Sequence, residues 1–455
     1  MRNLQKLIMF KKIRLSSVDK RSARAILNVA LSFVIKGWAG GIQLILVPLI
    51  LVCLGQYVAG IWLTISSMLL WVESFDFGLG NGLRNKLAEA VALDNWDEAR
   101  RAVSTTFIIM LGFVVPLILL LLAIIMHIDA YELLNVDIEK LPNLYTTLLT
   151  TIVIVGITFV FKIIGNIYLG LQLPAVNNLL VVAGQTLGAL AIFILHKCYG
   201  ELSLLQVAVA STGATVLVYI VAYPITFHYF PQLRPSWKMF DKKMLNILFA
   251  KGIMFFILQI SGIVLFLSSN VLISNLLSPA EVTPYQVVYR YFSFVTMLFS
   301  IFVTPLWAAT TDAYTKQDFN WIRMVTKRMY VLLCLFAILI VVMLLLAPYV
   351  YKIWVGEALY IDPLLSCMMA IYIMVIIYSL YFAHILFGIG HIRVQTYTTL
   401  AEAVCFFPLA YIGARIWGTP GILAALLFVN LFCAATNTIQ YKKIISGKAT
   451  GIWIK

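Results

Sequence analysis

Long apolar runs dominate this sequence and constrain its fold more than any other feature. The chain has 455 residues, of which 62% are hydrophobic and only 11% are charged. A helix of about 20 apolar residues crosses the roughly 30 Å hydrocarbon core of a bilayer and satisfies its own backbone hydrogen bonds there. The sequence therefore predicts an all-α membrane protein. Its twelve predicted spans are residues 26–53, 57–75, 103–127, 145–170, 177–198, 204–228, 249–277, 285–309, 330–355, 365–389, 395–416 and 421–440.

Lysine and arginine are concentrated in alternate connections between these spans. Cytoplasmic loops of membrane proteins carry an excess of basic residues, so the loops rich in Lys and Arg are predicted to face the cytoplasm. Most of the 33 basic residues then lie inside, including those of the segments 1–25, 229–248 and 441–455. The opposite side keeps only four of them, which are Lys140, Lys197, Lys352 and Arg415. Both chain termini are predicted to be cytoplasmic.

The net charge of +14 is distributed over short loops next to the membrane. Nucleic-acid binding would favour one coherent basic domain, which the sequence lacks, so anionic lipid headgroups are the predicted partner of these charges. The six cysteines lie in or at the ends of apolar spans without C-x-x-C spacing. They are predicted to be packing residues, and neither disulfides nor metal ligands.

The stretch ESFDFGLGNGLRNKLAEA, residues 73–90, carries three alternate glycines that resemble a nucleotide-binding loop. Such a loop requires a short preceding strand and a following helix within an α/β unit, and the preceding run here is long enough to span a membrane. No Lys-Ser or Lys-Thr pair follows the glycines. We therefore predict a helix end at the inner surface, where the chain reverses direction through residues that tolerate positive φ, with Arg84 and Lys86 beside it.

The segment after this glycine stretch recurs 223 residues later. LAEAVALDNWDEARRAVSTT and TTDAYTKQDFNWIRMVTKRM share an acidic residue, an alanine, an aromatic residue and an arginine at constant spacing, which pairs Glu89 with Asp312 and Arg100 with Arg323. Six predicted spans separate the copies, so both face the cytoplasm in a parallel repeat. Each copy is predicted to be a short amphipathic helix at the inner surface, with its aromatic residue at headgroup depth and its arginine toward lipid phosphate.

The repeat divides the chain into two bundles of six predicted spans. The first bundle is predicted over residues 26–228 and the second over 249–440, with the basic connection 229–248 as a cytoplasmic linker. Residues 1–25 and 441–455 form the predicted basic N-terminal segment and the cytoplasmic tail.

Three motifs resemble a known family. LGQYVAGIW at residues 54–62, FDFGLGNGLRNKLAEA at 75–90 and YLGLQLPAVNN at 168–178 are similar to the Wzx-type O-antigen flippases. These flippases form a branch of the multidrug/oligosaccharidyl-lipid/polysaccharide (MOP) exporter superfamily. The resemblance implies a V-shaped, MATE-like pair of pseudo-symmetric six-helix bundles around a central cavity. It also implies alternating-access transport, across the bacterial inner membrane, of undecaprenyl-pyrophosphate-linked oligosaccharide for O-antigen or another surface polysaccharide.

The same resemblance implies coupling to H⁺ or Na⁺ with no resident cofactor, and partners such as a polysaccharide polymerase and a chain-length regulator. Twelve spans argue against the lipid II flippases, which carry two further helices. The sequence contains no HExxH zinc motif, nucleophile elbow or Walker lysine, so we predict a transporter and not an enzyme.

Ionisable residues inside a span cost roughly 2.5 to 3.5 kcal/mol on insertion scales and are the candidate functional residues. Lys36, Lys162 and Arg290 are the in-span cations, and cations around a cavity would offset the charge of a pyrophosphate. Lys162 could instead snorkel toward the inner surface, and Arg290 could anchor at the outer interface. The candidate ion-coupling acids are Asp76, Glu402 and Glu73, with roles at helix ends as the alternative. Candidate gate or headgroup residues at the inner surface are Arg84, Lys86, Glu89, Arg100, Asp312 and Arg323.

Two other functions compete with this prediction. A cation-coupled multidrug antiporter of the same fold would need acidic residues in its cavity, whereas the in-span charges of this chain are mainly basic. A membrane glycosyltransferase or O-antigen polymerase usually has a large outer loop or a soluble domain, and the longest outer loop predicted here, residues 128–144, is short.

Overall fold

The computed structural model describes residues 20–74, 78–248, 265, 268–356, 359–391 and 393–454. Within these ranges the side chains of residues 20–33, 36, 70–74, 92, 304, 305, 308, 311, 312 and 315 lie outside the description. Every regular element of the described chain is a helix, which confirms the predicted all-α fold class.

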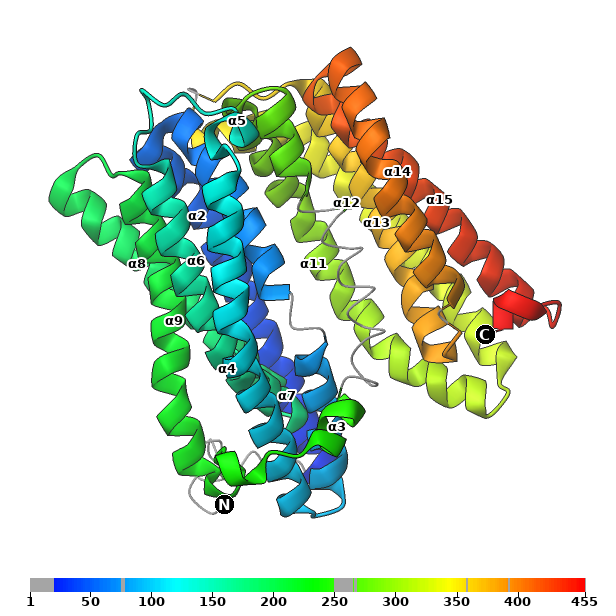
Figure 1. Ribbon diagram of the computed structural model, residues 1–455. Helices are drawn as coiled ribbons and strands as arrows, with labels where there is room; N and C mark the ends of the chain where they lie inside the picture. The colour runs from blue at the N-terminus through cyan, green and yellow to red at the C-terminus, as the bar shows by residue number, and fades with distance from the viewer. Residues whose placement is uncertain are drawn as a thin grey trace. The chain divides into compact units, whose positions relative to one another are not determined.

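Figure 1 shows the helices of the described chain in sequence order by colour. Those of the first half are α2 (Lys20–Ser74), α3 (Leu79–Ala92), α4 (Trp96–His127), α5 (Ala130–Leu134), α6 (Leu144–Phe161), α7 (Ile163–Gly170), α8 (Pro174–Tyr199) and α9 (Leu204–Tyr229). Two 3₁₀ turns follow, η1 (Pro231–Leu233) and η2 (Trp237–Met239). The second half contains α11 (Pro279–Thr315), α12 (Phe319–Val355), α13 (Pro363–Ile389), α14 (Arg393–Trp417), α15 (Thr419–Ile445) and η3 (Gly451–Ile454).

Ten helices of the described chain are long and apolar enough to cross a membrane, which makes the protein a multi-pass membrane protein. The count differs from twelve for two reasons. First, α2 joins the predicted spans 26–53 and 57–75, with a kink at Gly55, whose φ of 70° and ψ of 167° interrupt the helix. Positive φ costs glycine little, so the chain bends there at low cost. Second, most of the predicted span 249–277 lies outside the described residues.

The chain divides into two compact units that do not follow the sequence in one cut. Unit 1 comprises Met1–Cys53, Leu69–Ala130 and Leu141–Phe256, and unit 2 comprises Leu54–Met68, Tyr131–Lys140 and Ile257–Lys455. The middle of α2 therefore packs with unit 2, although the helix starts and ends in unit 1. The bundle boundaries proposed from the sequence stay a prediction.

In unit 1, α8 packs against α9, α9 against α6, and α6 against α4 (Figure 1). The short helix α3 packs against α4 and α7 through leucines spaced four residues apart, Leu79, Leu83 and Leu87, which are almost fully buried. Each buried leucine contributes about 1.5–3 kcal/mol, so this stripe holds α3 against the bundle. Gly170 at the end of α7 allows the close approach, because a Cβ there would lie 2.9 Å from the Leu87 side chain.

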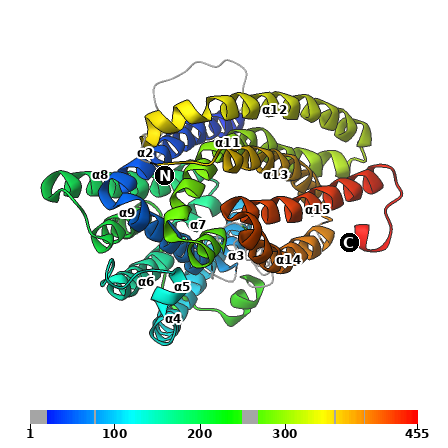
Figure 2. The ribbon, with the colours of Figure 1, turned by 90° about the horizontal axis from the view of Figure 1, so that it is seen from above.

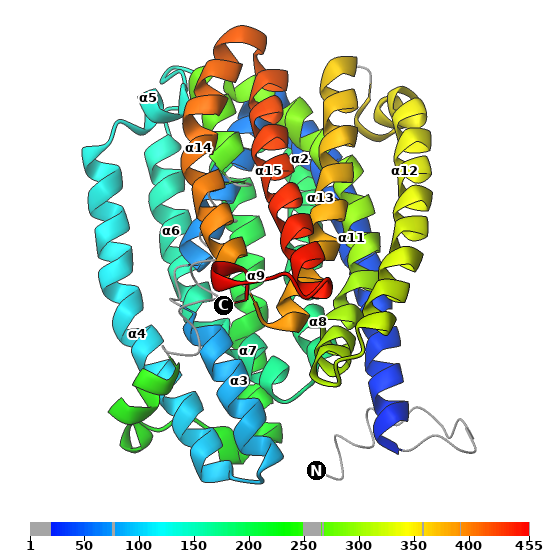
Figure 3. The same cartoon turned by 90° about the vertical axis from the view of Figure 1, so that its right-hand side faces the viewer.

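In unit 2, α14 packs along α15, α15 along α13, and α13 along α11, as Figures 2 and 3 show from two directions. Helices α12, α13 and α15 meet at a buried cluster of hydroxyl groups. Tyr381 of α13 donates to Thr326 Oγ1 of α12 at 2.8 Å, and Tyr441 Oη of α15 lies 2.7 Å from the same oxygen. Because these hydroxyl groups satisfy one another, their burial between apolar helices carries little penalty.

Candidate functional site

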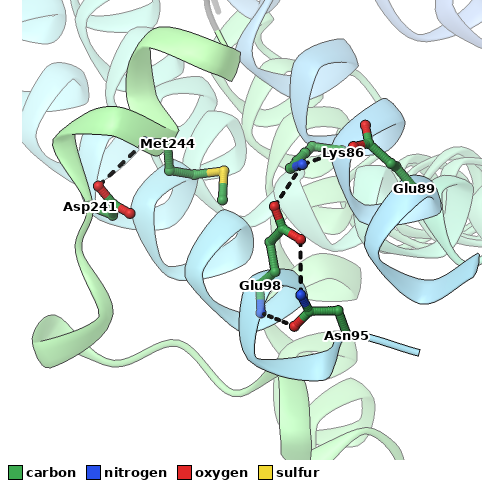
Figure 4. A network of polar contacts seen from close by, with 6 residues as sticks. All are labelled: Lys86, Glu89, Asn95, Glu98, Asp241 and Met244. Carbon is green, nitrogen blue, oxygen red and sulfur yellow. Dashed lines mark hydrogen bonds and ion pairs between the residues drawn. The ribbon is translucent and has the colours of Figure 1, made fainter. Parts of the chain in front are cut away.

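A buried ion pair joins α3 to α4 in unit 1. Lys86 Nζ donates to Glu98 Oε1 at 2.7 Å and to Glu89 Oε1 at 3.0 Å, as Figure 4 shows. The Lys86 side chain is 8% exposed, whereas those of Glu98 and Glu89 are 30% and 44% exposed. One lysine therefore bonds two carboxylates at the edge of the apolar core of α3 and α4.

The start of α4 places Glu98 for this contact. Asn95 is the N-cap, and its side-chain oxygen accepts from the Glu98 backbone N–H at 3.1 Å. The Asn95 side-chain amide in turn donates to Glu98 Oε2 at 3.1 Å, which leaves Oε1 facing Lys86 (Figure 4). An acidic residue in the first turn is also favoured by the helix dipole, so local sequence and tertiary contact agree at Glu98.

Lys86 remains charged in this environment. The hydrogen bond to Glu98 raises the pKa of Lys86 above its ordinary value, with a further contribution from Glu89, although burial of the ammonium group acts in the opposite direction. The charge of Lys86 is thus paired within unit 1, and its role at the inner gate or at lipid headgroups stays a prediction. The neighbouring Arg84 is exposed on the same helix, and its headgroup role stays a prediction.

The connection after α9 is bound along the first turns of α4. Arg100 Nε donates to the Arg234 carbonyl at 2.9 Å. The Ser104 and Thr105 hydroxyls accept from the backbone N–H groups of Ser236 and Asp241, each at 3.1 Å. Asp241 then accepts from the N–H of Met244 (Figure 4). The predicted linker is thus fixed to α4 over at least these residues.

The two copies of the sequence repeat have the same backbone geometry. Asp94 and Gln317, 223 residues apart, have φ of 55° and 57°. The next residues, Asn95 and Asp318, donate their backbone N–H to Ala90 and Ala313 at 2.9 Å each. Their side chains then cap α4 and α12. Each copy is therefore the end of one helix, a left-handed turn and the start of the next helix, and not one short amphipathic helix.

The paired arginines also have matching contacts. Arg323 Nη2 donates to the Ile445 carbonyl at 2.9 Å, and its Nη1 donates to Asn320 at 3.2 Å. Ile445 ends α15, the last helix of its half, just as Arg234 follows α9. Each arginine thus bonds a backbone carbonyl of its own unit, and contact of the arginines with lipid phosphate stays a prediction. The side chain of Asp312 lies outside the description, so its pairing with Glu89 stays a prediction.

Two of the three in-span cations lie in the described part of the chain. Lys162 is half-buried at the short break between α6 and α7, eight residues before the span ends at Gly170. Arg290 is half-buried eleven residues into the span that begins at Pro279, about 16 Å along the helix at 1.5 Å per residue. Helix α11 begins six residues before the predicted span 285–309, so Arg290 lies farther from the start of its helix than the sequence predicted. The side chain of Lys36 lies outside the description.

Among the three candidate coupling acids, only the side chain of Glu402 is described; Asp76 and the side chain of Glu73 fall outside. Glu402 is 4% exposed in the middle of α14, which excludes the solvated role at a helix end. Its carboxyl group lies against the Cys433 thiol of α15. A carboxyl group buried this deeply in a span needs a functional explanation.

A polar network in unit 2 includes residues that the sequence did not single out as a group. The Asn270 side-chain amide donates to the Ser67 hydroxyl of α2, and Gln286 of α11 donates to Asn270 Oδ1 at 2.7 Å. Asn275 similarly donates to the Leu133 carbonyl at 2.9 Å. These contacts join different segments of unit 2, as polar side chains in apolar spans commonly do.

Two proteins of related sequence bear on the class of this chain, although no family model matches it. The first is the "Putative O-antigen transporter" of Salmonella typhimurium, 24% identical over 291 residues, which are 62% of this chain and 64% of that protein. The second is the "Putative O-antigen export protein" of Yersinia pseudotuberculosis, 21% identical over 408 residues, which are 85% and 88% of the two chains. The chain thus spans less than two thirds of the Salmonella protein.

Solved structures of similar fold include transporters of the MOP superfamily. An inward-facing multidrug resistance MATE family transporter of the MOP superfamily matches 91% of this chain and 94% of its own, with a TM-score of 0.72 and 17% identity. An outward-facing conformation of such a transporter matches 93% and 97%, with a TM-score of 0.64 and 15% identity. The protein therefore has the MATE-like fold of the MOP transporters. Fold and sequence similarity together confirm the resemblance to the O-antigen branch of that superfamily.

Proposed function

We propose that this protein is a flippase that moves isoprenoid-pyrophosphate-linked oligosaccharide across the bacterial inner membrane. The observation that carries the proposal is the combination of a MOP-transporter fold with sequence similarity to two proteins named for O-antigen export. The two relatives are named as transporters, which supports a non-enzymatic function.

The chemistry of the spans supports an anionic cargo. Lys162 and Arg290 are half-buried about 12 Å and about 16 Å along the chain from the nearer ends of their spans at 1.5 Å per residue. A pyrophosphate entering a membrane protein loses its hydration, and guanidinium or ammonium groups offset this loss. Lys36, Lys162 and Arg290 are the proposed cargo-contacting residues.

The distribution of charge supports the proposed orientation. Arg84, Lys86, Arg100 and Arg323 gather near the turns between α3 and α4 and between α11 and α12, and the tail after α15 is also basic. With these ends in the cytoplasm, both termini are cytoplasmic. We further propose cation coupling, and delivery of the cargo to a polymerase and its chain-length regulator.

The experiment uses a strain that lacks this gene and assembles a surface glycan only when the gene is restored. Arg290→Gln and Lys162→Gln are predicted to reduce glycan at the surface severely while the protein remains at the normal level in the membrane. Arg328→Gln, an exposed arginine of α12, is the matched control and should leave the glycan unchanged. Normal glycan in the two in-span variants would refute the cationic mechanism.

A cation-coupled multidrug antiporter is the second candidate, because the described MATE neighbours include multidrug resistance transporters. Drug export predicts that deletion of the gene sensitises cells to cationic drugs and leaves the surface glycan intact. The flippase function predicts the opposite pattern, so the same deletion strain separates the two.

A further inference from the structure

Six polar side chains lie along the contact between α14 and α15, which run side by side in opposite directions (Figure 3). Three lie on α14 and three on α15, each set spaced three or four residues apart, so each set follows one helix face. All are at most 9% exposed. We name these residues the polar seam: Gln395, Thr398, Glu402, Cys433, Asn437 and Gln440.

The contacts fix both ends of the seam. At the deep end the Glu402 carboxyl group lies against the Cys433 thiol, which Thr398 also approaches. At the other end the Gln440 amide donates to the His391 carbonyl at 2.9 Å and to the Trp453 carbonyl at 3.2 Å. Trp453 belongs to η3. The centroid of the Trp453 ring lies 4.0 Å from Lys443 Nζ. The seam therefore leads from Glu402 to the segment that follows α15.

The seam contains more acceptors than donors. In the described part of the chain, four of its buried oxygens receive no hydrogen bond: Gln395 Oε1, Glu402 Oε1, Asn437 Oδ1 and Gln440 Oε1. The orientation of the Gln440 side-chain amide is determined, because its nitrogen donates to the His391 and Trp453 carbonyls and its oxygen must then point the other way. A buried acceptor without a donor costs about 1–3 kcal/mol, so a row of four requires donors such as water molecules or a proton.

The charge of Glu402 requires a partner as well. Among the residues that the structure describes, the titratable groups that interact with Glu402 are the Cys433 thiol of α15 and the Tyr372 phenol of α13, and neither group carries positive charge. His391 lies at the far end of the seam, where its ring contacts Tyr314. An ionised carboxylate in an apolar span needs a counter-charge, and here a proton delivered along the seam can supply it.

We propose that Glu402 is a proton-binding carboxyl group, reached by water along the polar seam from the end of α14 and α15 that η3 covers. The path is short, since Glu402 lies nine residues beyond Arg393, about 14 Å at 1.5 Å per residue. A hydronium ion in the seam transfers its proton to the carboxylate, an O–H bond forms, and a water molecule remains. This inference rests on the proposed transport function and names the proton as its coupling ion.

The test is infrared difference spectroscopy of the purified full-length protein in a detergent that has no ester carbonyl. The carbonyl stretch of a protonated carboxylic acid should appear and disappear with pH in the wild type. It should be lost in Glu402→Gln, shifted in Glu402→Asp, and unchanged in Glu139→Gln, an exposed carboxylate of unit 2. A spectrum of Glu402→Gln identical to that of the wild type would overturn the proposal.

Two further measurements test the ion and the path. Adding Na⁺ at constant pH should leave the band unchanged, whereas its disappearance would make the site a sodium site and refute the proton. Hydrogen–deuterium exchange of this carboxyl group should be slower in Gln440→Leu than in the wild type, and equal rates would refute the path. The spectra need no cargo, so failure of this inference is distinguishable from failure of the flippase function, which the surface glycan reports.

Discussion

Lys86 of α3 and Glu98 of α4 lie 2.7 Å apart and tie the two helices together beside a buried leucine stripe. Lys86→Met keeps the apolar stem and leaves two carboxylates without their cation. Because Glu98 is partly exposed, we expect a loss of about 1–2 kcal/mol, between the values for surface and buried pairs. The measurement is the thermal unfolding midpoint in detergent. Arg84→Met, an exposed cation on the same helix, should have little effect; an equal loss in both would contradict the ion pair.

The pH dependence of this contact has a defined sign. The hydrogen bond to Glu98 raises the pKa of Lys86, so the folded state holds its proton more tightly than the unfolded chain. The stabilisation is therefore complete below the unfolded lysine value of about 10.4 and is lost as the pH rises through the folded value. The difference in midpoint between wild type and Lys86→Met should be constant from neutral pH to about pH 10 and should shrink above it. Shrinkage that begins near pH 8 would be inconsistent with this assignment.

Arg323 should hold the end of α15 through a geometry that lysine cannot reproduce. Its two terminal nitrogens reach the Ile445 carbonyl and Asn320 together, whereas an ammonium group is a single point donor. Arg323→Lys is expected to speed tryptic cleavage at Lys448, which follows α15. Arg328→Lys is the control on an exposed face of the same helix. Cleavage at the wild-type rate in Arg323→Lys would mean that the contact does not restrain the end of α15.

The start of α15 should tolerate no side chain at Gly421. A Cβ there would lie 1.9 Å from the Gly413 carbonyl oxygen of α14, a backbone atom that cannot move aside. Gly421→Ala is expected to lower stability by about 1–3 kcal/mol through overpacking. Gly213→Ala on α9, where nothing lies within 4 Å, should be neutral or slightly stabilising. Equal midpoints for the two variants would show that α14 and α15 separate easily.

The sequence predicted the features that depend on local pattern. Apolar runs located the helices, because run length and hydrophobicity determine what can span a bilayer. The spacing of the repeat identified two segments of matching structure, although the single short helix predicted for each segment was wrong.

The features that the sequence could not predict depend on partners far along the chain. Arg100 bonds the Arg234 carbonyl, a group that every residue has and no motif marks. Lys86 looked like a free cation in a basic loop, and only packing shows that Glu98 neutralises it. Glu402 stands in the sequence as an isolated acid in a span, and the seam is visible only in the structure, where α15 brings Asn437 and Gln440 alongside α14.

The central claim is transport of a lipid-linked glycan, and reconstitution tests it most directly. The purified protein is placed in liposomes that carry an isoprenoid-pyrophosphate-linked oligosaccharide, and a membrane-impermeant reagent measures how much of the sugar reaches the opposite leaflet. We predict rapid transfer with the wild-type protein and strongly reduced transfer with Arg290→Gln. Transfer no faster than in protein-free liposomes, together with export of cationic drugs by the same preparation, would contradict the flippase function.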